Sequence, residues 1–421
     1  MRPPSKTRCP SVCVIYATFT PSIRFLWFCA ASLACCLVRS AARKKESPLR
    51  LPGSHAPESP CLVIDLQRVR DNFRALRSAL PTARIRFAVK ASPQPEIIRL
   101  LADEGAEFDV ASIGEIEQCL GLGVDPAVLC YGNPIKKATH IAAAYAAGVR
   151  RYAFDTESDL ERIAEFAPNS EVECRFLASA PQSQTPFGTK FGCAPGEAVH
   201  LLVRARDLGL RVVGPYFHVG SQQLDPAAWR IGIEQAGAIA EALAVKDISV
   251  TAVNIGGGLP ISYADPAPGT TELGEVIAAA MAESLPEHTE LIVEPGRALV
   301  GNAGVVHAEV VSVRKAPDGR RWVYLDIGRY NGMAETENEY IAYRFETGRD
   351  GDPLEEAVVA GPTCDGDDVL YQRTRVLLPT TLQAGDPIRI LDTGAYTASY
   401  SSVSFNGFPP LAVTVIGAER E

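Results

Sequence analysis

The stretch that decides the fold is RIRFAVKAS, residues 84–92. Ile85, Phe87 and Val89 alternate with their neighbours at the two-residue period of a β-strand, and Ala88 is small enough for a crowded interior. Lys90 follows at the C-terminal end of this strand, so its amine emerges from an apolar wall. A lysine at a strand end is often only a surface residue whose stem crosses apolar side chains to reach water. The rest of the chain must decide whether Lys90 is a nucleophile.

Short apolar segments and amphipathic segments alternate along the chain as far as residue 293. This alternation is typical of parallel β/α units, and eight of them predict a closed (β/α)8 TIM barrel, with a doubly wound open sheet as the structural alternative. Seven helices are expected between the strands. The expected strands are residues 85–89, 107–110, 128–131, 151–154, 171–177, 211–217, 250–255 and 290–293.

The pattern changes after residue 297, where strand-like segments follow one another without regular helices. We therefore expect an α/β barrel domain over residues 53–297 and a C-terminal β domain, a sandwich or barrel-like sheet, over residues 298–421. A strand expected within residues 58–66 precedes the barrel and is a candidate to pair with the β domain. The expected strands of the β domain are residues 305–313, 321–326, 357–360, 387–391 and 411–415.

The first 52 residues differ in composition from the rest of the chain. Residues 1–45 contain no Asp or Glu, and the apolar run at 25–38 is shorter than the roughly 20 residues of a membrane span. This extension has features of a signal segment and of a transit peptide, and it also fits translation from a misplaced start codon. We favour the last interpretation, because the sequence after Pro52 is typical of a cytosolic enzyme.

Charge and cysteine content limit the possible partners. The 421-residue chain carries a net charge of −9, whereas nucleic acid and anionic membranes bind clustered positive charge. The six cysteines beyond residue 60 show no C-x-x-C spacing, so they predict neither a zinc site nor a disulfide framework. We therefore expect a cytoplasmic protein, without nucleic-acid or membrane partners and without a bound metal.

Polar and glycine residues gather at the C-terminal ends of the expected strands, the rim where barrels of this kind carry their active sites. Each has an ordinary explanation by itself: the three consecutive glycines as a flexible turn, the histidine as a core residue, the carboxylate as half of a local ion pair. Their recurrence at one rim favours a site. The set comprises Lys90, Asp109, Arg175, His218, Ser221, Gly256, Gly257, Gly258, Glu294 and Arg297.

This set fits pyridoxal 5'-phosphate. Lys90 would bind the cofactor's aldehyde as a Schiff base, and Glu294 would keep the pyridine nitrogen protonated so that the ring can accept electrons. His218 would stack on the ring. Arg175, expected within a strand, would lie beside the phenolic oxygen or brace Glu294 or His218. The phosphate would be held by the three glycines, whose backbone N–H groups can approach an anion closely, together with Ser221 and Arg297.

Six motifs, in this order, resemble the fold-type III pyridoxal-phosphate decarboxylases, and among them the ornithine decarboxylase family, over residues of about 58 to 418. They are FAVK (87–90), HVGS (218–221), GGG (256–258), EPGR (294–297), GPTCD (361–365) and GAY (394–396), with FNGF (405–408) near the end. The resemblance implies an alanine-racemase-like barrel with a β domain, assembled as a homodimer with shared active sites. Cys364 and Asp365 would then serve the neighbouring subunit, Cys364 as proton donor and Asp365 as ligand of the substrate's distal ammonium. Tyr396 would hydrogen-bond the phosphate.

The segment expected to contact the distal amine departs from the eukaryotic pattern. Arg344 follows Tyr343 where eukaryotic-type ornithine decarboxylases carry an aspartate, so the likeness is to the bacterial ornithine/lysine branch. Tyr343 stays a candidate substrate ligand, and Glu335 is a candidate substitute for the aspartate.

The resemblance implies decarboxylation of L-ornithine to putrescine, a step of polyamine biosynthesis. The alternatives are lysine decarboxylation to cadaverine and decarboxylation of diaminopimelate. A racemase would need a second base and would lack the Cys-Asp loop. A cofactor-free regulatory homologue would lack the lysine and the phosphate cradle that this chain retains.

Overall fold

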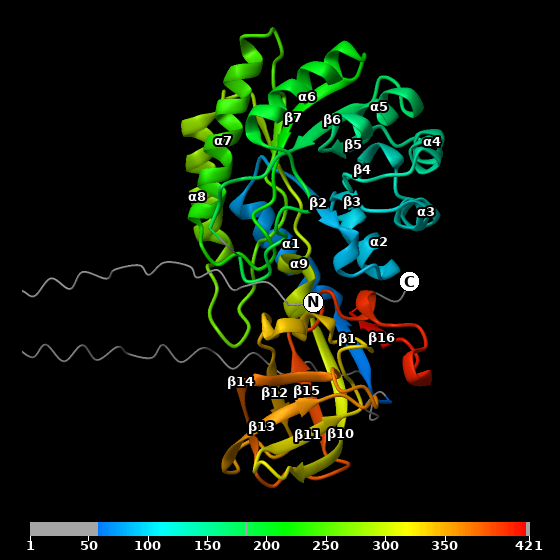
Figure 1. Ribbon diagram of the computed structural model, residues 1–421, viewed down its shortest axis with the longest axis vertical. Coiled ribbons are helices and arrows are strands. Elements are labelled where there is room, and N and C mark those ends of the chain that lie inside the picture. The colour runs from blue at the N-terminus through cyan, green and yellow to red at the C-terminus, as the bar shows by residue number, and fades with distance from the viewer. Residues whose placement is uncertain (1–57, 182, 418–421) are drawn as a thin grey trace, which may run out of the picture. The chain divides into compact units, whose positions relative to one another are not determined.

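The computed structural model describes residues 58–181 and 183–417, and the expectation for residues 1–52 therefore lies outside the described residues. Eight parallel strands close into a barrel, as expected, and not into an open sheet (Figure 1). In barrel order they are β2 (Arg84–Ala88), β3 (Glu107–Val110), β4 (Leu129–Tyr131), β5 (Arg151–Phe154), β6 (Glu171–Arg175), β7 (Arg211–Tyr216), β8 (Ala252–Asn254) and β9 (Glu290–Val293).

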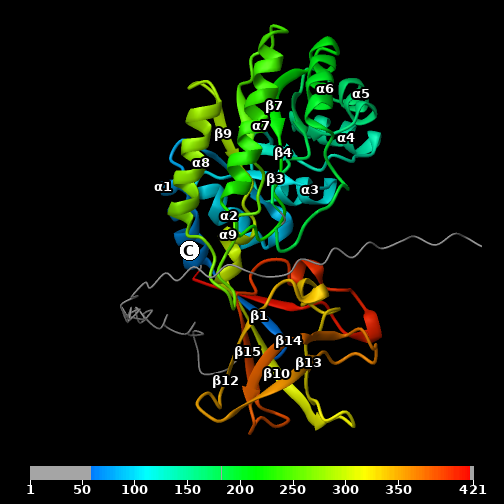
Figure 2. The same cartoon turned by 60° about the vertical axis from the view of Figure 1, so that its left-hand side comes forward.

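Seven helices connect these strands and surround the barrel (Figure 2). Local signals set where they begin: Ser112 and Thr156 each accept a hydrogen bond from the helix they precede, and Pro95 and Pro195 occupy the first helical position. The helices are α2 (Pro95–Asp103), α3 (Ile113–Gly121), α4 (Ala138–Ala146), α5 (Glu157–Phe166), α6 (Pro195–Asp207), α7 (Ala227–Ala244) and α8 (Thr270–Ser284).

Two more helices flank the barrel. Helix α1 (Leu66–Ala79) begins at Asp65, whose carboxylate accepts from the first backbone N–H groups, and it packs against α8, where Gly274 lies close to the Ala79 carbonyl. The four-residue helix α9 (Arg297–Val300) follows β9. Because β9 ends only four residues before Arg297, α9 holds that arginine at the rim of the barrel.

The second layer of structure is an eight-stranded sheet. Its path runs β12-β15-β10-β11-β13-β14, and β1 joins it by pairing with β10 and β16 (Figure 1). The expected strands are present, and two that the sequence did not suggest, β12 and β14, form the two ends of the path. The strands are β1 (Cys61–Asp65), β10 (Gly304–Lys315), β11 (Arg321–Leu325), β12 (Arg344–Thr347), β13 (Leu354–Ala360), β14 (Val369–Pro379), β15 (Pro387–Leu391) and β16 (Ala412–Ile416).

Strand β1 ties the start of the described chain to its end. It runs parallel to β16, with Leu62 opposite Val413, and antiparallel to β10, with Leu62 opposite Val306. All of its residues except Asp65 are buried. The barrel, which lies between β1 and β10 in sequence, is thus an insertion between strands of one sheet.

Side chains alternate between two environments along the barrel strands. Phe87 and Phe108 pack edge to face against each other, with ring centroids 6.5 Å apart. Arg86, one residue away, is also fully buried, but its polar partners come from β3, from β6 and from Glu294, which follows β9. The barrel interior is therefore charged, while an apolar layer fills the space beneath the helices.

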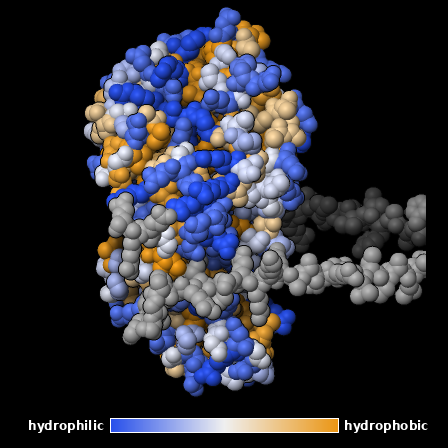
Figure 3. Space-filling model, turned by 180° about the vertical axis from the view of Figure 1, so that it is seen from behind, coloured by the Kyte–Doolittle hydropathy of each residue, from blue (hydrophilic) through white to orange (hydrophobic). Residues whose placement is uncertain are grey.

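The molecular surface is mixed in character. Hydrophilic and hydrophobic residues alternate over the face seen in Figure 3. Among the described residues no helix has the length and apolar character that a membrane crossing requires. Within the same residues, all six cysteines are free thiols and no cluster of His, Cys, Asp and Glu is arranged to hold a metal ion.

Candidate active site

Lys90 lies at the rim of the barrel, in the short 3-10 turn Val89–Ala91 that follows β2. Its Nζ is 2.8 Å from Oδ2 of Asp109, which lies on β3 opposite Ala88. Desolvation by itself would lower the pKa of the amine, but the side chain is 46% exposed and the Asp109 carboxylate outweighs this effect, so the pKa is raised. A Cβ at Gly132 would come within 2.0 Å of Asp109 Oδ1, so glycine leaves room for that carboxylate.

A cleft opens beside Lys90. It brings together most of the residues that the sequence suggested from separate strands. Gly256 and Asp109 lie directly behind the cleft wall, since Gly256 packs against His218 and Asp109 holds the Lys90 amine. The suggested residues that line the cleft are Lys90, His218, Ser221, Gly257, Gly258, Glu294, Arg297 and Tyr396, and Phe187, Gln222 and Leu259 join them.

His218 is held as a neutral imidazole. Its Nδ1 accepts a hydrogen bond of 3.0 Å from the Gly220 N–H, so the ring hydrogen resides on Nε2. Burial lowers the pKa of His218 well below its ordinary value, and the positive charges of Arg175 and Lys90 act in the same direction. The ring of Phe187 lies 4.7 Å from the imidazole, centroid to centroid. His218 therefore offers a flat, uncharged surface to the cleft.

The three glycines form a cradle that side chains would fill. Gly256 and Gly258 have φ of +66° and +86°, which favours glycine. A Cβ at Gly257 would lie 2.5 Å from the Glu294 carbonyl oxygen, and one at Gly258 would lie 2.3 Å from the Gly220 carbonyl oxygen. The backbone of Gly257 and Gly258 thus borders the cleft without side chains in the way, an arrangement suited to a phosphate.

Arg297 is buried beside this cradle. Its Nη2 donates to Ser221 Oγ at 3.0 Å and its Nη1 to Tyr263 Oη at 2.5 Å. Its Nε is buried without a hydrogen-bond partner among the described residues. The ring of Tyr396 lies 5.2 Å from the guanidinium carbon, and the Tyr396 hydroxyl borders Gly296. Buried cationic, hydroxyl and backbone donors around one cradle fit the phosphate group of pyridoxal phosphate.

Glu335 forms a two-point ion pair with Arg297. The contacts are 2.6 Å to Nη2 and 2.8 Å to Nη1, and the carboxylate is only 10% exposed. Both carboxylate oxygens are therefore engaged on the phosphate side of the cleft. The expected contact of Glu335 with a substrate amine stays a prediction, while its contact with Arg297 is a feature that the sequence did not suggest.

Tyr343 and Arg175 lie outside the cleft lining. Tyr343 is 4% exposed and packs edge to face on Tyr263 at 5.3 Å. Arg175 lies between the rings of Phe191 and Tyr216, at 5.4 and 5.2 Å from their centroids. The expected mid-strand position of Arg175 is wrong, because β6 ends at this residue and the chain then turns into an irregular segment that returns at Cys193.

Glu294 follows β9 and points into the barrel from the cleft side. It is 4% exposed, and its Oε1 accepts a 2.6 Å hydrogen bond from Asn254 Nδ2. Burial, and then the negative charge of Asp109, raise the pKa of Glu294 to about 7. A carboxyl with such a pKa is matched to a pyridine nitrogen with which it can share a proton.

Cys364 and Asp365 lie on the surface, in the turn between β13 and β14, and do not line the cleft of their own chain in the described residues. The Cys364 backbone N–H and thiol both donate to Asn406 Oδ1, at 3.1 and 3.3 Å. Asp365 Oδ1 accepts from the Tyr330 hydroxyl at 3.3 Å. An exposed, oriented thiol and carboxylate are thus available to another molecule.

Several residues of the site were missed from the sequence. Arg86 and Glu173 stand out only as charges between apolar strand neighbours, and Asn254 only as the polar end of a three-residue strand. Asn406 lies in the FNGF motif and adopts a left-handed φ of +52°, which asparagine tolerates. Phe187 carries no signal beyond being aromatic in a loop.

Comparisons with known proteins agree with this geometry. Residues 66–301 match the family described as pyridoxal-dependent decarboxylase, pyridoxal binding domain. A lysine/ornithine decarboxylase of Selenomonas ruminantium is 35% identical over 364 residues, 85% of this chain and 89% of that protein. An ornithine decarboxylase of Neurospora crassa is 31% identical over 392 residues, 83% and 79% of the two chains. The crystal structure of a Vibrio vulnificus lysine/ornithine decarboxylase with cadaverine has a TM-score of 0.78 at 30% identity, covering 85% of this chain and 95% of that one.

The family match spans more than half of the chain, and the relatives align along most of their own length. Pyridoxal phosphate is therefore the cofactor of this protein, and its residues fit that group as described above. The chain belongs to the ornithine decarboxylase family of fold-type III pyridoxal-phosphate-dependent decarboxylases.

Proposed function

We propose that this enzyme decarboxylates a basic L-amino acid, with L-ornithine as first substrate and L-lysine as second, giving putrescine and cadaverine for polyamine biosynthesis. The observation that carries the proposal is the exposed Cys364–Asp365 pair, which presents a thiol and a carboxylate oriented by Asn406 and Tyr330. A carboxylate suits a distal ammonium group, and relatives that align over most of this chain act on ornithine and lysine.

The cleft residues have distinct roles in this proposal. Lys90 would hold the cofactor through its aldehyde carbon, and Asp109 orients the Lys90 amine at 2.8 Å. Glu294 would keep a proton at the pyridine nitrogen, and His218 would cover the ring face. The bound cofactor supplies an electron sink for the charge left when carbon dioxide departs. The phosphate would be held by Gly257, Gly258, Ser221, Arg297 and Tyr396, while the Gly256 N–H is engaged by Asn254 Oδ1.

We propose a homodimer in which Cys364 and Asp365 complete the site of the neighbouring copy. The thiol hydrogen would pass from Cys364 Sγ to the substrate carbon that has lost carbon dioxide, and Asp365 would pair with the distal ammonium. Both residues lie on the surface of their own chain, which supports this assignment. The free thiols of the described cysteines support a cytoplasmic location.

The position after Tyr343 bears on the choice of substrate. Arg344 is paired with Asp392, at 2.7 Å from Nη2 to Oδ2. Arg344 is a cation where the eukaryotic-type enzymes carry a carboxylate, and it is already paired with Asp392. It therefore offers no negative charge to a distal amine, and recognition of that amine would rest on Asp365. A single carboxylate tolerates a difference of one methylene in substrate length, which favours a dual preference for ornithine and lysine over strict selection.

The substrate proposal is tested by measuring carbon dioxide release from ornithine, lysine, arginine and diaminopimelate. Turnover of ornithine, with lysine next, is expected. Failure to turn over either of these two overturns the assignment, and preferential turnover of diaminopimelate replaces it with the alternative.

Shared sites are tested by mixing inactive subunits. Lys90→Ala and Cys364→Ala chains, unfolded and refolded together, should regain about a quarter of wild-type activity, because half of the dimers are mixed and each has one intact site. Lys90→Ala mixed with His218→Ala is the matched control. This mixture should stay inactive, because the same subunit supplies both residues to each site and no site in the mixed dimer is intact. Equal activity in the two mixtures would rule out the shared arrangement.

A further inference from the structure

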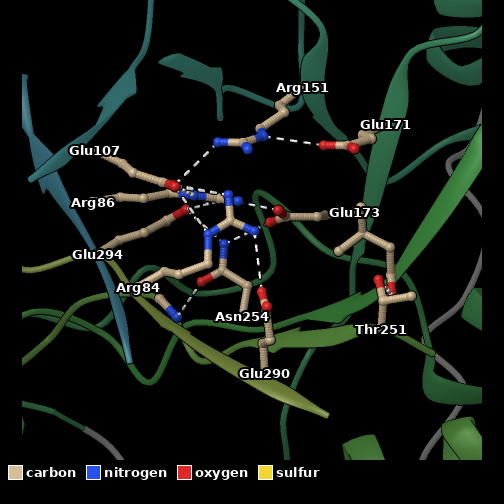
Figure 4. Close-up of polar contacts among 12 residues, drawn as sticks. Arg84, Arg86, Glu107, Arg151, Glu171, Glu173, Thr251, Asn254, Glu290 and Glu294 are labelled. Atoms are coloured by element: carbon tan, nitrogen blue, oxygen red, sulfur yellow. Dashed lines mark hydrogen bonds and ion pairs between the residues drawn. The ribbon is translucent and has the colours of Figure 1, made fainter. Parts of the chain in front are cut away.

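A buried amide separates two carboxylates inside the barrel. Asn254 Nδ2 donates to Glu173 Oε2 at 2.7 Å and to Glu294 Oε1 at 2.6 Å (Figure 4). Its Oδ1 accepts from the Gly256 N–H at 2.9 Å, which fixes the orientation of the amide. Glu173, Asn254 and Glu294 are 2%, 1% and 4% exposed. Because both amide hydrogens are committed, the two carboxylates are held on either side of one donor.

One cation faces this pair from below. Arg86 is 1% exposed, and its Nη1 lies 2.7 Å from Glu173 Oε1 but 3.8 Å from Glu294 Oε1. The closer contact is an ion pair and not a hydrogen bond, because Arg86 Nη1 and Glu173 Oε1 have no hydrogen-bond partner within the described residues. Arg86 Nε donates to Glu107 Oε2 at 3.1 Å. The guanidinium therefore compensates Glu173 and Glu107 more closely than Glu294.

The charges below Arg86 are balanced without help from the cleft. Glu107 is paired with Arg84 and Arg151 as well as Arg86, and these two arginines reach Glu290 and Glu171 at the far end of the barrel (Figure 4). Glu171 is also paired with Arg211, so three carboxylates face three arginines there without Arg86 being counted. The upper layer then contains two carboxylates, Glu173 and Glu294, and a single cation. It lacks one positive charge when both are ionised, on the side that faces the cleft.

We propose that Glu173 and Asn254 are positioning residues: they orient the Glu294 carboxylate and keep Arg86 from neutralising it, so that Glu294 stabilises the protonated form of the cofactor's pyridine nitrogen. Glu173 draws Arg86 away from Glu294, and Asn254 turns Glu294 Oε1 toward itself, leaving the other oxygen for the ring. The protonated nitrogen supplies the missing cation. This inference rests on the proposed role of Glu294 and extends it to two residues that touch neither cofactor nor substrate.

The groups around Glu294 agree with this arrangement. Burial raises its pKa most, Asp109 of β3 and Glu173 of β6 raise it further, and Arg86 of β2 lowers it. Two more titratable side chains face it, the Cys130 thiol of β4 and the Tyr216 phenol of β7. Burial keeps both in their neutral forms by raising their pKa values well above the ordinary range. Glu173 is thus a carboxylate whose removal would let Arg86 turn fully toward Glu294.

The test compares two ligands of the cofactor-free full-length protein. Equilibrium affinity is measured for pyridoxal phosphate and for its analogue in which C–H replaces the ring nitrogen, which cannot be protonated there. Wild type should prefer the cofactor. Glu173→Gln keeps the shape and the acceptor for Asn254, and should reduce this preference about tenfold, the equivalent of one pH unit in the pKa of Glu294. Its affinity for the analogue should change less than twofold.

Glu171→Gln is the matched control, because it removes the same charge two residues earlier on β6, where Glu171 pairs with Arg151. It should leave the preference unchanged. An equal loss of affinity for both ligands in Glu173→Gln would mean a merely structural role and overturns the inference. No preference in wild type would instead refute the proposed role of Glu294. If Glu173→Gln does not fold, Asn254→Ser is measured, and an unchanged preference there also overturns the inference.

Discussion

The raised pKa of Glu294 makes the stability of the cofactor-free protein depend on pH in a defined window. The value of about 7 compares with 4.5 for an ordinary glutamate. Between these two values the folded protein keeps a proton that the unfolded chain has released, so stability falls as pH rises. Each pH unit is worth about 1.4 kcal/mol. Ionising Glu294 should therefore remove about 3 kcal/mol from the free energy of unfolding, all of it before pH has risen much beyond 7.

Glu294→Gln isolates this contribution, because glutamine mimics the protonated acid and still accepts from Asn254. The free energy of unfolding of both proteins is measured in urea from pH 4.5 to 8 without cofactor. The variant should gain about 3 kcal/mol relative to wild type across this range, with other titrating groups cancelling in the difference. Glu290→Gln, at the exposed end of the same strand, should give a flat difference. A flat difference for Glu294→Gln as well would refute the reasoning.

Three further outcomes are expected. Glu335→Gln leaves the buried Arg297 charge without its counter-ion and should cost about 3 kcal/mol of unfolding free energy in the cofactor-free protein, with inorganic phosphate restoring part of it in thermal denaturation. Asn406→Ala removes the acceptor that orients Cys364 and should lower kcat about tenfold with little change in KM, measured by carbon dioxide release. Lys90→Ala should lose covalent retention of the cofactor after borohydride reduction and denaturation, and lower activity by roughly a thousandfold or more.

Each of these has a control or a contrary result. Glu337→Gln alters a carboxylate that is 68% exposed in the segment of Glu335, and its stability should stay within about 0.5 kcal/mol of wild type. If inorganic phosphate stabilises Glu335→Gln and Glu337→Gln equally, Arg297 does not bind the phosphate. A rise in KM as large as the fall in kcat in Asn406→Ala would mean that it acts on substrate binding. Covalent retention in Lys90→Ala would exclude the amine as the attachment point.

The parts of the site that follow strand ends could be predicted from the sequence. Lys90, His218, Glu294 and the three glycines each come directly after an apolar strand, and the parallel barrel brings such positions to one rim. The local strand pattern was sufficient to place these residues, because the barrel topology brings the ends of all its strands together.

The charged barrel interior could not be predicted in this way. Arg86 contacts Glu173, far away in sequence, and a charged residue in a short strand is ordinarily assumed to face water. Only the closed barrel shows that these positions face one another. Strands β12 and β14 were missed for a related reason. Both lie at the ends of the sheet path, where polar residues such as those at 372–375 of β14 are tolerated because one edge is unpaired.

Because β1 pairs with β16, the barrel can be completed during synthesis well before the β domain can. The barrel sequence is complete once Val293 has been made, whereas β1, already waiting since residue 65, acquires its parallel partner only after another 123 residues, at Ile416. At about 5 to 20 residues per second this delay lasts roughly 6 to 25 s. β1 lacks both neighbouring strands until β10 is complete at Lys315, and it lacks β16 for the rest of this time. The nascent chain therefore carries an open sheet edge that a ribosome-associated chaperone would be expected to cover.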